Sequence, residues 1–390
     1  MRAQQRMRCG YARHLSHNSL VARRSQALRS PFLSDTFDLT DHLMTNPMTF
    51  RQKLLSGEFA LMSRAELTRV LLLVAAILAT VLWVLFSVVE PPPPKRVQML
   101  TGNSSGAYYG FAQRYAQALK KNGIELVPVQ SNGSVENLQK LLSDDTPYQV
   151  ALIQSGIAAD VLPKWDPTDV NGNVDPPPLE SLAAVAYEPV WVFYKPQAGA
   201  PKPVTFAAFK GRKIAIGPEG SGTRAVALRL LKSVAVNASN SAFSPLSGSE
   251  AVEAVLKGEQ DAVFLVASAS APSVQRALEG GLRAVSLDQA DAYVRLNPWL
   301  SKISLPRGVV SMARDLPDEE LTLVAASANL VVHKSLHPAI SYLLMDVASE
   351  VHRAPTILNG LKEFPSEKSL EFPQREESRR YFKTGRPVLQ

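Results

Sequence analysis

The stretch Val97–Val129, VQMLTGNSSGAYYGFAQRYAQALKKNGIELVPV, decides how this chain can fold. Its apolar start at 97–100 predicts a strand, and a loop rich in Gly, Ser and Asn follows. Apolar residues at helical spacing predict a helix over 108–121, which an Asn-Gly pair ends. A second strand is expected at 125–129. Strand, helix and strand in this order are typical of a βαβ unit in a parallel sheet.

The same alternation runs through the rest of the chain and predicts two α/β lobes. A long apolar run at 182–194, interrupted by Glu188-Pro189, joins them, and a Pro-rich segment at 166–178 reads as a surface loop. Further helices are expected at 134–142, 223–232, 249–257, 273–279 and 338–351, and further strands at 148–153, 213–216, 262–266, 282–287 and 321–333.

An uncharged run at 70–89, VLLLVAAILATVLWVLFSVV, precedes the lobes. A helix of about 20 apolar residues spans a hydrocarbon core of roughly 30 Å. Four basic residues lie within 51–69, whereas only Lys95 and Arg96 follow the run closely, so residues 1–69 are expected in the cytoplasm. We therefore predict a basic, disordered arm, a transmembrane signal anchor at 70–89, a stiff Pro-rich spacer at 90–96 and an external domain.

Two alternatives concern this N-terminal part. A cleaved signal peptide has a shorter apolar region of about 7 to 15 residues that ends in small residues, so an uncleaved anchor fits better. Residues 1–34 contain seven Arg and no acid, which also resembles an organelle presequence. The arm lacks amphipathic periodicity, which favours disorder or a true start at Met44 or Met48. The single Cys, Cys9, also lies in the arm.

Charge is distributed unevenly along the chain. Residues 1–69 hold eleven Lys or Arg against five Asp or Glu, whereas residues 90–390 hold 31 against 30. The external domain is therefore nearly neutral, which excludes a nucleic-acid partner as the explanation of the net charge. It contains no Cys, and we expect neither a metal nor a cofactor.

Polar loops follow several strands at their carboxyl ends, where open α/β sheets bind ligands. Three such loops lie at 101–109, 131–136 and 154–156 in the first lobe, and a fourth, GPEGSGTR at 217–224, lies in the second. All are rich in Gly and in small hydroxyl or amide side chains, and helices begin in or after them. Helix capping alone explains one such loop, with Ser134 a suitable cap. Four loops at the expected edges favour an anion site.

The GPEGSGTR loop invites a nucleotide interpretation. Gly217 and Gly222 have the spacing of a Walker A loop, but Thr223 stands where Lys is required to contact phosphate. A nucleophile elbow centred on Ser221 needs Gly at 219 and 223, where Glu219 and Thr223 stand. The loop is therefore predicted to offer N–H groups and hydroxyls to one carboxylate.

Residues that would support an enzyme are few. The external His residues are His333, His337 and His352, and surface or capping roles are expected for them because no Cys or carboxylate completes a zinc site. The acidic run 318–320 reads as a solvated helix start, and Trp191 reads as core, with a place in the cleft as the alternative.

The chain resembles the TAXI-type solute receptors of TRAP transporters over about 97–351, through motifs in a fixed order: TGNSSGAYYGFAQRYAQAL, SNGSVENLQKL, YQVALIQSGIA, IAIGPEGSGTRAVALRL and DAVFLVA. A membrane-anchored branch of that family is similar also through LPRGVVSMARDLPDEELTLVAASANLVVHKSLHP and the C-terminal EFPSEKSLEFPQREESRRYFKTGRPVLQ. Members of that branch usually continue into a second membrane segment.

This resemblance implies a two-lobed, periplasmic-binding-protein-like fold of type II, which closes on a small organic anion such as an acidic amino acid or a dicarboxylate. The first lobe would comprise about 97–181 with the C-terminal return, and the second about 195–300. The ligand-binding residues that it implies are Ser105, Gly106, Tyr108, Tyr109, Ser134, Gln154, Ser155, Gly220, Ser221, Gly222 and Thr223. Ala107 stands where the family usually has Thr, and Gly156 where it commonly has Asp.

We therefore expect an α/β, two-lobed solute-binding protein without catalytic activity. Its expected location is the inner membrane, with the main domain facing the periplasm or cell exterior and residues 70–89 in the bilayer. TRAP membrane subunits are expected partners. A ligand sensor or scaffold without transport is the alternative, and an α/β enzyme is a third possibility.

Overall fold

The structure is a computed structural model that describes residues 63–88, 92–104, 106–162, 175–199 and 201–385. The chain divides into two compact units, Met1–Glu90 and Pro91–Gln390. Most of the predicted basic arm and of the predicted loop at 166–178 lies outside the described residues.

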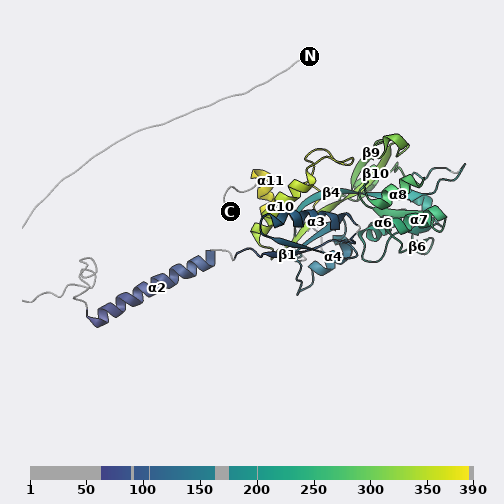
Figure 1. Ribbon diagram of the computed structural model, residues 1–390. Helices are drawn as coiled ribbons and strands as arrows, with labels where there is room; N and C mark the ends of the chain where they lie inside the picture. The colour runs from purple at the N-terminus through teal and green to yellow at the C-terminus, as the bar shows by residue number, and fades with distance from the viewer. Residues whose placement is uncertain (1–62, 89–91, 105, 163–174, 200, 386–390) are drawn as a thin grey trace, which may run out of the picture. The chain divides into compact units, whose positions relative to one another are not determined.

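The first unit contains helix α2, Arg64–Val88 (Figure 1). At its start the Ser63 N–H donates to Glu66 Oε2 at 3.0 Å, and the Glu66 N–H donates to Ser63 Oγ at 3.3 Å. This reciprocal capping box fixes the first turn. The segment Arg64–Phe86, which contains an 18-residue window with a mean hydropathy of 2.6, is long and apolar enough to cross a membrane. The helix begins before the predicted run at 70–89.

The strands of the second unit form one mixed sheet. Its order is β2-β1-β3-β10-β4-β7-β5-β6, with β8 beside β4 and β9 beside β10. The strands are β1 (Arg96–Leu100), β2 (Glu125–Val129), β3 (Val150–Gln154), β4 (Leu179–Tyr194), β5 (Lys213–Ala215), β6 (Ala242–Ser244), β7 (Ala262–Val266), β8 (Arg283–Ala284), β9 (Ser301–Leu305) and β10 (Leu321–His333).

Two parallel groups of strands make the two lobes, and the long strands β4 and β10 connect them. In lobe 1, β1 pairs in parallel with β2 and β3; in lobe 2, β5 pairs in parallel with β6 and β7. Residues 179–189 of β4 pair with β10, and residues 190–194 pair with β7. The predicted two-lobed α/β fold is confirmed.

The expected interruption at Glu188-Pro189 was wrong, because β4 runs through it as one strand. Pro189, which has no N–H to donate, stands where β4 leaves β10 and begins to pair with β7. Of the predicted strand at 282–287 only β8 is observed. A bend at 317–319 stands where a helix start was expected at 318–320.

Helices pack against the strands of both lobes (Figure 1). They are α3 (Ala107–Lys120), α4 (Ser134–Leu141), α5 (Ala158–Val161), α6 (Gly222–Ser233), α7 (Gly248–Lys257), α8 (Pro272–Glu279), α9 (Ala290–Leu296), α10 (Pro338–His352) and α11 (Glu376–Thr384), with short 3-10 turns at Phe206–Phe209 and Met312–Arg314. All five helices that the periodicity predicts in the second unit besides α3 are present. The sequence did not predict α5, α9, α11, β6 or β9.

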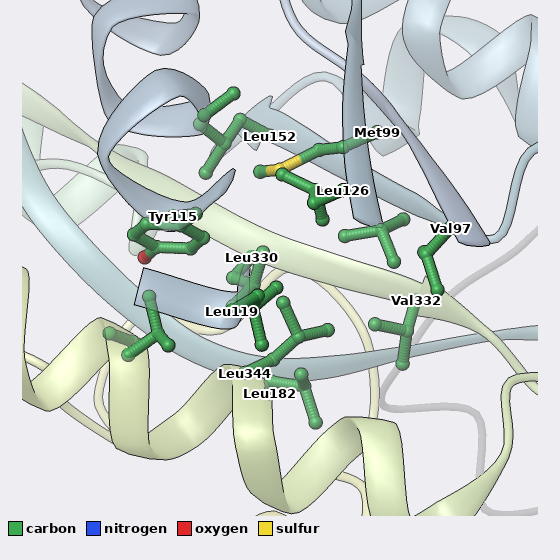
Figure 2. Close-up of a cluster of buried hydrophobic side chains, with 14 of the residues drawn as sticks. Val97, Met99, Tyr115, Leu119, Leu126, Leu152, Leu182, Leu330, Val332 and Leu344 are labelled. Carbon is green, nitrogen blue, oxygen red and sulfur yellow. The ribbon is translucent and has the colours of Figure 1, made fainter. Parts of the chain in front are cut away.

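The core of lobe 1 holds α3 and α10 against the sheet. Figure 2 shows Met99 of β1, Tyr115 and Leu119 of α3, and Leu344 of α10 in one buried cluster. Each fully buried Leu side chain contributes roughly 1.5 to 3 kcal/mol relative to an exposed one. This packing fixes α3 so that its N-terminus lies at the carboxyl end of β1.

The segment after α10 returns along β4. Ser366 pairs with Ala184 in an antiparallel bridge. The buried Arg375 guanidinium lies 2.9 Å from Glu180 and 2.8 Å from Glu377, and it donates to the Leu336 carbonyl at 2.7 Å. We call residues 353–375 the C-terminal strap. It fastens the end of the chain to β4.

Candidate functional site

A buried asparagine joins the loops of lobe 1. Asn137 Nδ2 donates to the Thr101 carbonyl at 2.5 Å and to the Leu152 carbonyl at 2.9 Å. Its Oδ1 accepts a hydrogen bond from the Ser131 hydroxyl at 2.6 Å. One side chain thus ties together the ends of β1, β2 and β3. This network positions the loops that the sequence predicts as ligand-binding.

Five helices begin around one cavity of about 510 Å³ between the lobes. The first residues of α3 and α4 reach it from lobe 1, and those of α6, α7 and α8 reach it from lobe 2. No side chain caps the N-terminus of α3, α4, α7 or α8 by a hydrogen bond. Each helix N-terminus carries about half a positive charge and N–H groups without intrahelical partners. The dipoles of the five helices all favour negative charge in the cavity.

The lobes are in contact where α4 and α6 begin. A Cβ on Gly222 would lie 2.8 Å from Gln154 Oε1, and a Cβ on Gly133 would lie 3.7 Å from the Gly222 nitrogen. Gln154 Nε2 also donates to the Gly222 carbonyl at 3.4 Å across the lobe boundary. A side chain at 222 would therefore displace the end of the Gln154 side chain from the point where the lobes are in contact.

Two hydroxyls predicted to face a ligand are also used within the protein. Ser134 was expected to cap α4, but Gly133 holds the cap position, and Ser134 Oγ accepts a hydrogen bond from the Gln154 N–H at 2.9 Å. Ser221 Oγ caps α6 by accepting from the Arg224 N–H at 3.2 Å, and it donates to the Pro218 carbonyl at 2.8 Å. The Ser221 hydroxyl hydrogen is thus committed to its own loop.

A buried acid lines the cavity beside a buried phenol. The Tyr108 hydroxyl donates to Glu188 Oε2 at 2.6 Å, and the two side chains come from α3 and β4. Burial raises the pKa of Glu188 to about 7, although the hydrogen bond from Tyr108 opposes this shift. Burial, reinforced by the neighbouring Glu188, raises the pKa of Tyr108 well above its usual range. Sequence reasoning noted Glu188 only as an interruption of an apolar run.

The one basic side chain on the described cavity wall is that of Arg114. It is exposed, it stacks over the Phe111 ring at 5.1 Å, and it forms no ion pair with another described residue. The lobe 2 wall carries the hydroxyls of Ser249, Ser268 and Ser270. This combination of N–H groups, hydroxyls and one cation suits a small anionic ligand.

The structure brings most of the predicted site residues together. Those that line the cavity are Gly106, Tyr108, Ser134, Gln154, Ser221, Gly222 and Thr223. Tyr109 does not line it, and Gly220 lies on a separate groove beside α6. Ser155 turns away and donates to the Trp299 carbonyl at 3.0 Å. Ser105 lies outside the described residues.

Gly156, where the resembling family commonly has Asp, also lies off the cavity wall. Its φ is +87°, and a Cβ there would lie 2.4 Å from the Trp299 ring. The buried Glu371 of the C-terminal strap accepts hydrogen bonds from the Gly156 N–H at 2.6 Å and the Ala158 N–H at 2.5 Å. The Trp299 ring leaves no room for a side chain at 156. The carboxylate that contacts this turn is instead that of Glu371 on the C-terminal strap.

Other candidate residues have structural roles. Trp191 is fully buried, stacks on Phe193 at 5.6 Å and donates to the Ala267 carbonyl at 2.9 Å. His337 caps α10, in line with the expected capping role. The expectation for His352 was wrong, because its ring is buried. Among the described residues no group of three or more His, Cys, Asp or Glu is placed to hold a metal ion.

Comparisons with known proteins were made on both sequence and structure. A family model described as the NMT1-like family matches residues 99–370. A search of curated proteins gives no match.

Solved structures of two bacterial proteins are similar in fold. One is the periplasmic aliphatic sulphonate binding protein SsuA from Escherichia coli, with 16% identity and a TM-score of 0.37 over 66% of this chain and 68% of that chain. The other is MatC from Rhodopseudomonas palustris with bound malate, with 18% identity and a TM-score of 0.41 over 66% of this chain and 84% of that chain.

Proposed function

The chain belongs to the NMT1-like family, and on this premise we propose that residues 97–390 form a solute-binding domain that captures a small organic anion. The ligand class is an acidic amino acid or a dicarboxylate. The cavity between the lobes holds it, without catalysis.

The observation that carries this proposal is the convergence of five helix N-termini on one cavity, four of them without a side-chain cap. N–H groups at such ends bind carboxylates, and the helix dipoles add to the attraction. The cavity volume of about 510 Å³ falls within the usual range of roughly 300 to 1,000 Å³ for small-molecule sites.

Closure of the lobes explains how binding is signalled. The ligand contacts helix ends from both lobes at once, so it binds the closed form more tightly than the open form and shifts the equilibrium toward it. The proposed hinge comprises β4 and β10, the two strands that pass between the lobes.

The wider context rests on the sequence resemblance. We propose that residues 70–89 anchor the protein in the inner membrane, that the domain faces the periplasm or cell exterior, and that it passes its ligand to TRAP-type membrane subunits. Helix α2, with its apolar segment Arg64–Phe86, supports the anchor. The nearly neutral domain is not suited to nucleic acid.

The test is a screen of the full chain in detergent micelles against amino acids, dicarboxylates and inorganic anions. A true ligand at 100 times its Kd raises the free energy of unfolding by about 2.7 kcal/mol, which a thermal-shift measurement detects. Isothermal titration then gives the Kd. A flat response to every compound in the screen would contradict the proposal.

A matched pair of variants shows whether binding uses the cavity. Gly222→Val places a side chain against Gln154 where the lobes meet, and we expect it to abolish the response. Gly360 lies on the C-terminal strap, where an added Cβ would meet only Glu363, at 3.7 Å. The Gly360→Val variant should therefore bind the ligand as the wild type does.

A further inference from the structure

One acidic group in the cavity has no role in anion capture. Glu188 lies on β4 with 8% of its surface exposed, and Tyr108 is the one hydrogen-bond partner that the described residues give it. Since Tyr108 occupies Oε2, the second oxygen, Oε1, is left for a group inside the cavity that Glu188 lines. The β10 residue opposite Glu188 is Ala326, which offers no charge or hydrogen-bonding side chain.

Glu188 points toward the cavity because consecutive side chains of a strand alternate between the two faces of the sheet. Tyr187 points to the opposite face of β4, where its hydroxyl donates to Glu363 at 2.8 Å and its ring packs on Phe364. The described residues therefore include two Tyr–Glu pairs, Tyr108 with Glu188 and Tyr187 with Glu363. The pair of Tyr187 and Glu363 is exposed and lies outside the cavity, whereas the pair of Tyr108 and Glu188 lines it.

A ligand that carries only carboxylates suits the helix N-termini but not Glu188. It brings a second negative charge toward a buried carboxyl group, which disfavours the ionised form of that group. A ligand that also carries an ammonium group has a donor for Oε1. A charged hydrogen bond of this kind in a buried site is among the strongest that proteins make.

We propose that Glu188 and Tyr108 form an ammonium subsite, so that the domain prefers anions with an amino group, as in amino acids, over carboxylates that lack one. The ammonium donates to Glu188 Oε1, while the Tyr108 hydroxyl holds Oε2 and keeps the carboxylate aimed into the cavity. This proposal rests on the anion-binding function and adds a specificity-determining residue to it.

Proton exchange gives a second readout. With a pKa of about 7, Glu188 is half protonated in the ligand-free protein at pH 7. The titratable and charged groups on its side of the cavity are the Tyr108 phenol, which is neutral at this pH, and the rim guanidinium of Arg114. An ammonium favours the carboxylate, so binding releases up to about half a proton at pH 7. A dicarboxylate favours the neutral acid and takes a proton up.

The test compares ligands that differ in the amino group alone. Isothermal titration of the full chain in detergent micelles uses glutamate against glutarate and aspartate against succinate, extended to the other amino acids and their deaminated analogues. Each titration is run in two buffers of different ionisation enthalpy, which counts the protons exchanged. For the wild type we expect at least about tenfold tighter binding of the amino compound, the range of a charged hydrogen bond.

Variants assign that preference to Glu188. Glu188→Gln should remove both the preference for amino compounds and the release of protons on binding. Tyr108→Phe should reduce that preference. Glu363→Gln, in the second Tyr–Glu pair, should leave both unchanged. Equal or tighter binding of the deaminated compounds by the wild type, or a preference that survives in Glu188→Gln, overturns the subsite and leaves anion capture standing. Absence of binding to every compound overturns both.

Discussion

Arg229 of α6 in lobe 2 lies 2.7 Å from Asp160 of α5 in lobe 1, measured from Nη2 to Oδ2. The same guanidinium stacks over the Trp299 ring at 5.2 Å from its centroid. Together with the Gln154 to Gly222 hydrogen bond, this ion pair joins the two lobes in the structure.

Removing this interlobe pair should weaken ligand binding. Asp160→Asn takes away a contact that exists only when the lobes meet, so the open form gains population. Both side chains are partly exposed, and such pairs contribute about 0.2 to 1 kcal/mol, which predicts a Kd raised by up to about fivefold. Titration calorimetry measures the change. Glu253→Gln breaks a 2.5 Å pair with Arg276 within lobe 2 and should leave the Kd unchanged.

Gly156→Ala should destabilise the domain more than an ordinary Gly→Ala change at positive φ. The methyl group meets the Trp299 ring, and the φ of +87° adds strain. Overpacking costs about 1 to 3 kcal/mol and the left-handed backbone about 1 to 2 kcal/mol. Gly281→Ala, with a φ of +81° and open space around the Cβ, isolates the backbone part. Urea unfolding of both variants gives the difference, and equal losses would show that Trp299 moves aside freely.

Glu188→Gln should stabilise the ligand-free protein at neutral and alkaline pH. The pKa of Glu188 is raised in the folded state to about 7 from an ordinary value of 4.5, so the folded state binds the proton more tightly. Its contribution to stability is present below pH 4.5 and is lost as the pH rises through 7. The gain from the variant should grow by about 3 kcal/mol between pH 4.5 and 8. Denaturant titrations across that range test this, and a constant gain contradicts it.

His352→Phe should protect the protein against acid. Burial lowers the pKa of His352 to about 3 in the folded state from 6.5, so the unfolded chain binds the proton more readily. Stability is therefore lost as the pH falls from 6.5 toward 3. A Phe ring at 352 keeps the edge contact with Phe111, whose ring lies 4.7 Å from that of His352. Because Phe does not titrate, the variant should lose about 3 kcal/mol less of its free energy of unfolding than the wild type between pH 7 and 4. Burial lowers the pKa of the half-buried His333 as well, so unfolding curves of His333→Phe should show the pH dependence reduced in the same direction but to a smaller extent.

Local patterns predicted the elements that surround the cavity. The helices after 101–106, 131–133 and 217–221 begin where periodicity and small polar residues place them, because strand and helix propensity in a βαβ unit is expressed within short segments. The loop 217–221 forms a helix N-terminus at the lobe boundary, as expected. The carboxyl ends of parallel strands then bring these loops together.

Features that depend on distant contacts were not predicted. Glu188 meets Tyr108 across 80 positions of sequence, and a single acid in an apolar run gives no pattern that reveals such a partner. Ser155 belongs to the right loop, but its direction is set by the Trp299 carbonyl. The C-terminal strap lacks periodicity, and Glu371 contacts a turn that lies far away in the sequence.

The path of the chain through the sheet makes the second lobe an insertion. Strand β1 starts in lobe 1, the chain enters lobe 2 along β4 and leaves it along β10, and α11 packs on α10 in lobe 1. Both ends of the domain therefore belong to the same half. The lobe closure proposed above would therefore leave both ends of the domain in place with lobe 1.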